Sequence, residues 1–166
     1  MSIGHVVFVF FEKMNENYKI EFMREALAEA KKAAEIGEVP VGAVIVKDGE
    51  IIARAHNMVE AYKSSGAHAE MLAIERAEAA LEAKWLTGCE MYVTLEPCAM
   101  CAGALVLSRL EKLYIGASDP KTGACGSVMN IAQSEALNHR VEVESGILAN
   151  ESAEVLREFF REMRGI

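Results

Sequence analysis

Long apolar segments, low-complexity stretches and internal repeats are missing from this chain of 166 residues. The apolar run at residues 6–11 has only six residues, whereas a helix that crosses a membrane needs about 20. No basic segment precedes this run and no small-residue cleavage site follows it, so it differs from a signal peptide. We therefore expect a cytoplasmic protein that does not associate with membranes.

Positive charge is also scarce, because 17 Lys and Arg stand against 25 Asp and Glu, for a formal net charge of -8. This balance argues against binding nucleic acid through bulk charge, although it leaves room for a local basic patch. The four cysteines include a C-x-x-C pair and indicate a reducing compartment more than a disulfide framework. The chain is long enough for one domain with a substantial core.

Helical and strand patterns alternate along the chain. Asp48-Gly49 between two apolar runs predicts a tight hairpin. The predicted helices are 19–36, one after His68, 99–107 and one capped by Asn150, and the predicted strands are 41–46, 51–55, 91–95, 112–115 and 141–143. We expect an α/β fold, a three-layer α/β/α sandwich with a mixed central sheet, as a single domain over residues 14–166. Ligands of such folds bind beyond the strand ends, here near Pro97 and residues 117–127.

Two short motifs carry candidate metal ligands, His68-Ala69-Glu70 and Pro97-Cys98-Ala99-Met100-Cys101. One imidazole and two thiolates suit zinc, and catalytic zinc sites leave a fourth position open for water. His68 and Glu70 face one metal only if His68 lies at a helix N-terminus with Glu70 in the first turn. Cys98 and Cys101 are three residues apart and share a helix face.

We place Pro97 in the first turn of the helix that carries the cysteines. Its N-terminal dipole favours thiolates. A lone C-x-x-C is equally compatible with a redox pair or a structural zinc site, but Cys89 and Cys125 are poor candidates for a fourth ligand. The complete pattern predicts one catalytic Zn²⁺ per chain, with Glu70 free for proton transfer.

The H-x-E…P-C-x-x-C order resembles that of the zinc-dependent nucleobase deaminases. Over residues 18–164 the chain further resembles the bacterial tRNA-specific adenosine deaminases. The motifs that carry this resemblance are Glu38–Ala43, Thr94–Cys98, Asp119–Ala124, Gly126-Ser127, Met129-Asn130, Asn138-His139 and a last helix with Phe159-Phe160 and several arginines.

This resemblance implies a cytidine-deaminase-like fold, a homodimer, and hydrolytic deamination of adenosine to inosine at the wobble position of a tRNA anticodon stem-loop by a zinc-activated water. The resemblance assigns proton transfer to Glu70 and binding of the base to the side chain of Asn57. It also places the backbones of Ala67 and Cys98 against the base and the oxyanion. Further substrate contacts would come from Val39, Pro40, Lys121, Asn138, His139 and Phe160. Lys121, Arg109 and Arg140 are also candidates for phosphate contacts, with solvated surface charges as the alternative interpretation.

Simpler interpretations stand beside these assignments. Asn57 also suits a turn after a strand, Val39 a core position, and the arginines at 157, 161 and 164 also suit pairing with nearby glutamates. At the level of function, the alternatives are a deaminase of a free base or nucleoside (guanine, cytosine or cytidine) and a non-enzymatic zinc-binding domain.

The chain departs from the family pattern in three places. Ser64-Ser65-Gly66 stands before Ala67 where the family usually has Asp-Pro-Thr, and Cys125 replaces a small residue. Residues 1–13 have no counterpart, which makes Met14 a candidate for the native start. We expect this extension to be disordered and dispensable, with an edge strand or a partner contact as the alternative.

Overall fold

The computed structural model describes the backbone of residues 3–166 and the side chains from Asn15 onward. The elements in chain order are α1 (Ile3–Glu35), β1 (Gly42–Lys47), β2 (Glu50–His56), α2 (Val59–Tyr62), α3 (Ala69–Leu81), β3 (Cys89–Leu95), α4 (Ala99–Leu107), β4 (Lys112–Ala117), β5 (Glu142–Ser145) and α5 (Ala149–Met163). The alternation of strands and helices predicted from the sequence is confirmed.

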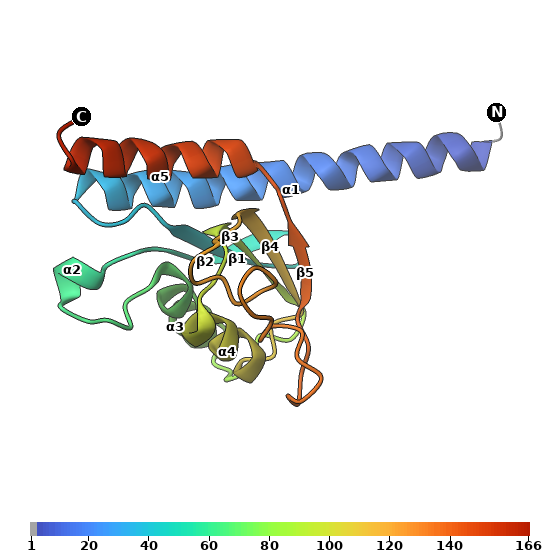
Figure 1. Cartoon of the computed structure of the whole chain (residues 1–166). Coiled ribbons are helices and arrows are strands. Elements are labelled where there is room, and N and C mark those ends of the chain that lie inside the picture. Colours follow the sequence, from blue (N-terminus) through green and yellow to red (C-terminus); the bar gives the residue numbers. More distant parts are fainter. Residues whose placement is uncertain (1–2) are drawn as a thin grey trace.

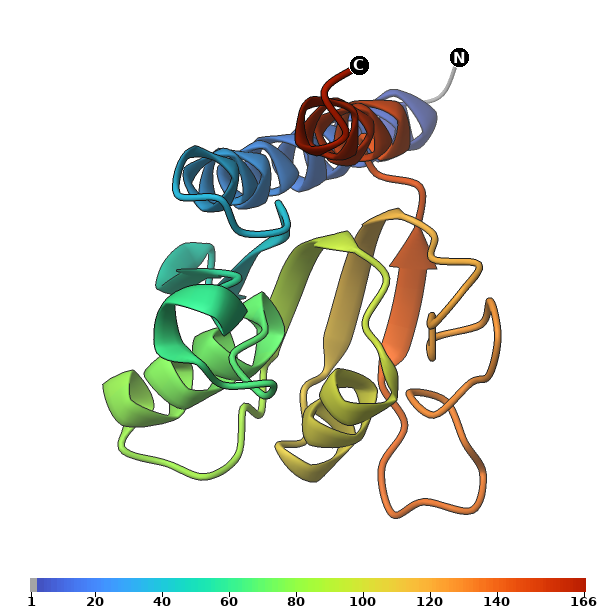
Figure 2. The same cartoon turned by 60° about the vertical axis from the view of Figure 1, so that its left-hand side comes forward.

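The five strands form one mixed sheet in the order β2-β1-β3-β4-β5. Strand β1 pairs antiparallel with β2 and β3, whereas β3, β4 and β5 run parallel. Helices α1 and α5 cover one face of the sheet and α3 and α4 cover the other (Figures 1 and 2). The predicted α/β/α sandwich with a mixed sheet is therefore confirmed.

The β1–β2 hairpin forms where the sequence predicted it. Asp48 and Gly49 both have positive φ, 49° and 78°, as a two-residue type I′ turn requires. The register closes the turn with Lys47 opposite Glu50. A shift of register between Ile45 and Val46 marks a bulge, which increases the local twist of the hairpin.

Neighbouring residues of the central strands point to opposite faces of the sheet, so two cores form. Ile45 and Met91 belong to the larger core, beneath α3 and α4. Val44 and Tyr92, their neighbours in the chain, belong to the smaller core beneath α1. Burial on both faces explains why these strands are apolar at nearly every position.

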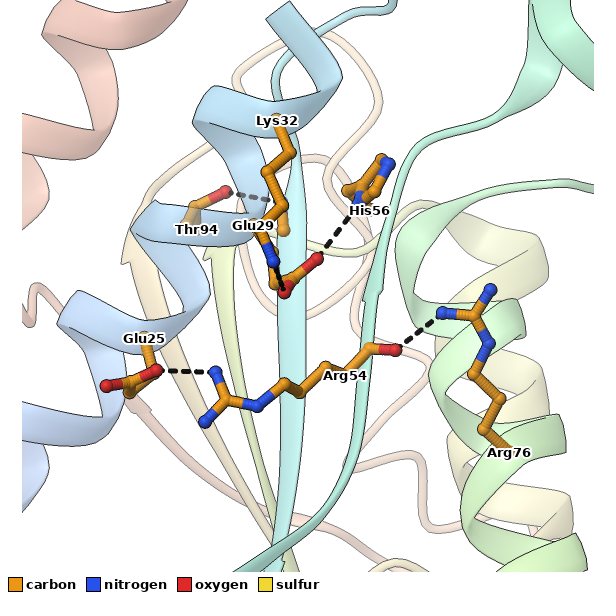
Figure 3. Close-up of polar contacts among 8 residues, drawn as sticks. Glu25, Glu29, Lys32, Arg54, His56, Arg76 and Thr94 are labelled. Carbon is orange, nitrogen blue, oxygen red and sulfur yellow. Dashed lines mark hydrogen bonds and ion pairs between the residues drawn. The ribbon is translucent and has the colours of Figure 1, made fainter.

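Helix α1 packs directly on β1 and is also tied to β2. A side chain at Gly42 would lie within 3.0 Å of the backbone of Ala26 and Ala30, so only glycine permits this approach. Glu29 of α1 pairs with His56 Nδ1 at the end of β2, 2.8 Å away (Figure 3). This contact fixes the point from which the chain continues into Asn57.

Helix α1 is much longer than the predicted helix 19–36. It begins at Ile3, so residues 6–11 are helical, and the expectation of a disordered extension or an edge strand is wrong. Neither glycine nor proline occurs between residues 5 and 36, and helix propagation is favourable once a helix has formed. The N-terminal half of α1 extends beyond the rest of the molecule (Figure 1). The side chains of residues 1–14 lie outside the described part of the chain.

Two helix starts also differ from the predictions. Helix α5 is capped by Leu148 in a left-handed conformation, φ 52°, and Asn150 lies inside its first turn. Pro97 precedes the cap residue of α4, Cys98, and is not in the first turn. The short helix α2 was not predicted, because four residues are too few for a periodic pattern.

Candidate active site

The candidate metal ligands meet at the ends of two helices. His68 is the N-cap of α3, and Glu70 lies in the first turn of that helix. Cys98 is the N-cap of α4, with Cys101 in its first turn. The chain reaches Cys98 directly from the carboxyl end of β3, where the sequence analysis placed ligand binding. The predicted helical positions of His68 and Glu70 are therefore confirmed.

The separations of the three ligand atoms fit zinc. His68 Nδ1 lies 3.6 Å from Cys98 Sγ and 3.5 Å from Cys101 Sγ. In a tetrahedral site with the usual Zn–S and Zn–N bond lengths, a sulfur and a nitrogen ligand are about 3.6 Å apart. Within the described residues the cluster contains only these three side chains, within 4.8 Å of one another. Three protein ligands leave one position for water, as in catalytic zinc sites.

The electrostatics of the two thiols also suit a cation. Hydrogen bonds with Cys101 and then His68 lower the pKa of Cys98 to about 3. The hydrogen bond with Cys98, together with burial, raises the pKa of Cys101. One thiolate is thus present at neutral pH without a metal, and the N-terminal dipole of α4 stabilises it. The hydrogen bond with Cys98 also raises the pKa of His68.

Glu70 is a buried carboxyl group beside the candidate ligands. Burial raises its pKa to about 7, and the neighbouring charge of His68 opposes this shift only partly. A group that titrates near neutral pH can both accept and donate a proton, as general acid–base catalysis requires. Glu70 and His68 line the same cavity.

That cavity has a volume of about 470 Å³, within the usual range for small-ligand sites of about 300–1,000 Å³. Val41, Leu95 and Phe159 form apolar parts of its wall. Asn57 contributes a buried side-chain oxygen, Oδ1, that has no hydrogen-bond partner. A buried acceptor without a partner costs about 1–3 kcal/mol, so this atom is available to a donor on a bound molecule.

The structure brings some of the predicted substrate residues to this cavity. Val39, Asn57 and Phe160 line it. Pro40 is buried beside Val39 without lining the cavity. Ala67 is buried, and its carbonyl oxygen already accepts the backbone N–H of Met58 at 3.0 Å.

Two other predicted contacts lie elsewhere in this chain. His139 Nε2 bonds the carbonyl of Leu110 at 2.6 Å, just before the start of β4. The cavity lies at the opposite end of β4, so His139 serves a local structural contact here. Its neighbour Asn138 is exposed and also does not line the cavity.

Lys121 is exposed and lines a second groove that adjoins the cavity. Phe160 lines both, and it is 43% exposed. We call this second groove the basic groove, because four of its six lining residues are cationic: it is lined by Lys121, Leu156, Arg157, Phe160, Arg161 and Arg164. These residues come from the loop after β4 and from α5, which lie far apart in the sequence.

Sequence reasoning missed several residues of the site. Asp119 and Thr122 line the cavity from the loop after β4. Glu38 and Glu96 are buried carboxylates at its border. Their occurrence directly beside predicted strand ends was a usable signal, since charged side chains are seldom buried without a structural or functional reason.

One imidazole, two thiols and a carboxyl group meet at two helix N-termini on a mixed α/β/α sandwich. This combination of fold and site is that of a nucleobase deaminase. The chain matches the MafB19-like deaminase family over residues 17–164. It is 58% identical to a tRNA-specific adenosine deaminase of Bacillus subtilis over 143 residues, 86% of this chain and 89% of the relative. The corresponding protein of Aquifex aeolicus is 57% identical, over 86% of this chain and 94% of the relative. The chain belongs to the tRNA-specific adenosine deaminases within this larger deaminase family.

Solved structures agree with this assignment. A tRNA:A34 deaminase, studied for A-to-I editing at the wobble position, superposes with a TM-score of 0.80 at 46% identity, over 82% of this chain and 99% of that one. A guanine deaminase of Nitrosomonas europaea gives 0.74 at 25% identity, over 84% and 83%. The predicted cytidine-deaminase-like fold is thereby confirmed.

Proposed function

We propose that this protein converts adenosine to inosine by hydrolytic deamination at the wobble position of a tRNA anticodon stem-loop. The observation that carries the proposal is the junction, through Phe160, of the cavity beside Glu70 with the groove lined by Lys121 and the arginines of α5. A cavity alone would suit a free base. A basic groove at its mouth suits a base that remains attached to a phosphate backbone.

His68, Cys98 and Cys101 would hold the zinc ion. When bound there, zinc would supply an activated water at neutral pH. Glu70 faces the same cavity and would take a proton from that water. It would deliver this proton to a ring nitrogen of the adenine. After the hydroxyl has added to C6, Glu70 would carry the proton of that hydroxyl to the amino group, which leaves as ammonia when its bond to C6 breaks.

The wall of the cavity would hold the base. The unpartnered Oδ1 of Asn57 would accept a hydrogen bond from an N–H of the base. Val39, Val41 and Phe159 would pack against the ring and exclude water. A base that reacts in such a pocket must leave its stack, and apolar walls compensate for part of the lost stacking.

The basic groove would bind the neighbouring backbone. Glu154 pairs with Arg157 at 3.0 Å and, more distantly, with Arg161 at 3.9 Å, so these two arginines are partly neutralised within α5. No carboxylate lies within ion-pair distance of Arg164 or Lys121 among the described residues. We therefore assign the principal phosphate contacts to these two side chains, with stacking on Phe160.

We also propose a homodimer. Met100, Gly103, Ala104 and Leu107 form an outward stripe along α4 with helical spacing. Leu107 is 80% exposed and borders apolar grooves on both sides of the helix. A second copy that covers this stripe would remove a contiguous apolar patch from water.

A cytoplasmic location follows from the proposed substrate. None of the described helices has the length and apolar character needed to cross a bilayer.

Purified protein should be assayed on an anticodon stem-loop with adenosine at the wobble position, and in parallel on guanine, cytosine and cytidine. We expect inosine in the RNA, detected by mass spectrometry of nucleosides, and no turnover of the free compounds. The Glu70→Gln variant serves as the inactive control. Deamination of a free base with an untouched stem-loop would instead assign the protein to the alternative class.

A further inference from the structure

Glu96 is a buried carboxylate that the proposed mechanism does not use. It stands between β3 and the segment Pro97-Cys98, and it is 5% exposed. No cation pairs with it among the described residues. Because burying an unpaired charge is costly, its hydrogen bonds must compensate for the lost hydration.

Its hydrogen bonds all come from one loop, residues 119–127. The carboxylate accepts the backbone N–H groups of Asp119 at 3.4 Å, Cys125 at 3.2 Å and Ser127 at 3.2 Å. It also accepts the hydroxyl of Ser127. Hydrogen bonds to an ionised acceptor are roughly twice as strong as neutral ones. A single side chain thus organises nine residues of the loop.

The loop is shaped around this carboxylate. A side chain at Gly123 would lie within 3.0 Å of Glu96 Oε2 and of the Asp119 carbonyl, so the position requires glycine. Two backbone bonds complete the connection, from Glu96 N–H to the Ala117 carbonyl at 2.9 Å and from Ala124 N–H to the Pro97 carbonyl at 2.8 Å. The loop and the cysteine segment are therefore one connected unit.

This loop supplies residues to both candidate substrate surfaces. Asp119 and Thr122 line the cavity, and Lys121 lines the basic groove. The Asp119 side chain accepts the N–H of Lys121 at 2.9 Å and the hydroxyl of Thr122 at 2.7 Å. These two bonds fix Lys121 and Thr122 relative to Asp119, which Glu96 holds. The position of these three residues thus depends on the anchor of the loop at Glu96.

The opposite wall uses a similar arrangement. Glu38 is 1% exposed and accepts the N–H groups of Glu60 at 3.2 Å and Ala61 at 2.7 Å, within α2. Each wall of the cavity is thus held by one buried carboxylate. Only Glu96 connects its wall to the segment that carries a candidate metal ligand.

We propose that Glu96 is a positioning residue for RNA. It holds loop 119–127 against the cysteine segment, so that Asp119, Lys121 and Thr122 are in place before the anticodon binds. The inference rests on the proposed function, and it assigns Glu96 an effect on substrate binding that is larger than its effect on the chemical step.

The test is Glu96→Gln, which keeps the shape but replaces one acceptor oxygen with an NH₂ group among N–H and O–H donors. We expect KM for the stem-loop to rise by roughly tenfold or more, with a smaller change in kcat and one zinc per chain retained. The matched control is Glu111→Gln, an exposed carboxylate just before β4, which should leave both constants unchanged. An unchanged KM, or a fall in kcat alone, would overturn the proposal.

A second variant keeps the test decisive if Glu96→Gln fails to fold or to retain zinc. Ser127→Ala removes one donor and leaves the carboxylate in place. We expect a smaller increase in KM, together with faster amide hydrogen exchange at Cys125 than in wild type or Glu111→Gln. Exchange needs no turnover, so it tests the anchor even if the wild-type protein proves inactive on the stem-loop. Unchanged exchange and unchanged KM in Ser127→Ala would reject the role of Glu96.

Discussion

The two sides of the candidate site are built in different ways. The metal side consists of His68, Glu70, Cys98 and Cys101, which lie at two helix N-termini, with His68 Nδ1 within hydrogen-bond distance of both thiols. The RNA side consists of exposed cations from a loop and from α5 around Phe160. Chemistry requires fixed geometry of every group at once, whereas each phosphate contact contributes its own increment to binding. We therefore expect changes on the metal side to have large effects and changes on the RNA side to have graded ones.

The largest effect should come from removing the metal. Cys98→Ala, or treatment of the wild type with a strong chelator, should reduce zinc well below one per chain and deamination to background, because two ligands seldom retain a catalytic zinc. Elemental analysis and the stem-loop assay measure both quantities. Cys89→Ala is the control, since this buried cysteine lies outside the cluster. Undiminished zinc in Cys98→Ala would rule out the ligand assignment.

The second-largest effect should come from replacing Glu70, the proposed proton carrier. Glu70→Gln, and likewise Glu70→Ala, should lower kcat by about 10²–10⁴-fold, the usual contribution of general acid–base catalysis. The zinc content should remain at the wild-type level, because Glu70 does not belong to the ligand cluster. Single-turnover assays measure the loss. A variant that retains more than about a tenth of the wild-type rate would contradict this role.

Asn57→Ala should have an intermediate effect. It removes the buried acceptor from the cavity wall, and the loss of one such bond to substrate lowers kcat/KM by about tenfold. Asn138→Ala is the matched control, because this asparagine is exposed and does not line the cavity. Equal losses in the two variants would mean that Asn57 does not hold the base.

Replacing cations on the RNA side should change how strongly stem-loop binding depends on salt concentration. Lys121→Ala and Arg164→Ala should each flatten the log–log salt slope of stem-loop binding by about 0.7, the value for one phosphate contact with a single strand. Removal of residues 157–166 should flatten it further, but it also removes Phe159 from the interior. Lys31→Ala, on the exposed side of α1, is the control. An unchanged slope in both point variants would show that the groove does not bind phosphate.

The smallest effect should follow removal of residues 1–13. Lys19 pairs with Glu16 and Glu144, and Met23 is fully buried, so the contacts that anchor α1 lie beyond the cut. A chain that starts at Met14 should keep its zinc content, its mass by light scattering and its rate of deamination. A clear loss of thermal stability would show that the projecting half of α1 is a structural element.

Light scattering on the full chain tests the proposed dimer as well. Leu107→Glu would place a charge in the outward stripe of α4 and should yield a single-chain mass without loss of zinc. A single-chain mass for the wild type at micromolar concentration would reject the dimer.

Most of the metal side could be predicted from the sequence, because its spacing is local. His68 with Glu70, and Cys98 with Cys101, are each separated by two or three positions at a helix start, and helix geometry alone relates such pairs. The hairpin at Asp48-Gly49 was predictable for the same reason, since two residues determine its turn.

Errors arose where no local rule decides the outcome. Helix α1 continues to Ile3 because the chain lacks a stop signal there. Helix α5 starts after Leu148 and not at Asn150, in the turn that follows β5. The substrate contact that the resemblance implies for His139 stays a prediction; nothing in the sequence indicated its hydrogen bond to Leu110, which depends on how two distant segments pack.

The sequence by itself determined the candidate metal ligands, the candidate proton carrier and the alternation of elements that folds into an α/β/α sandwich. These features follow from residue types and from the spacing of residues that are close together in the sequence. Only the tertiary structure decided that loop 119–127 and α5 meet at Phe160 to form the basic groove, and that Glu96 anchors the loop. Such contacts join residues 23 or more positions apart in the sequence, and the packing of both cores against the sheet decides which segments meet.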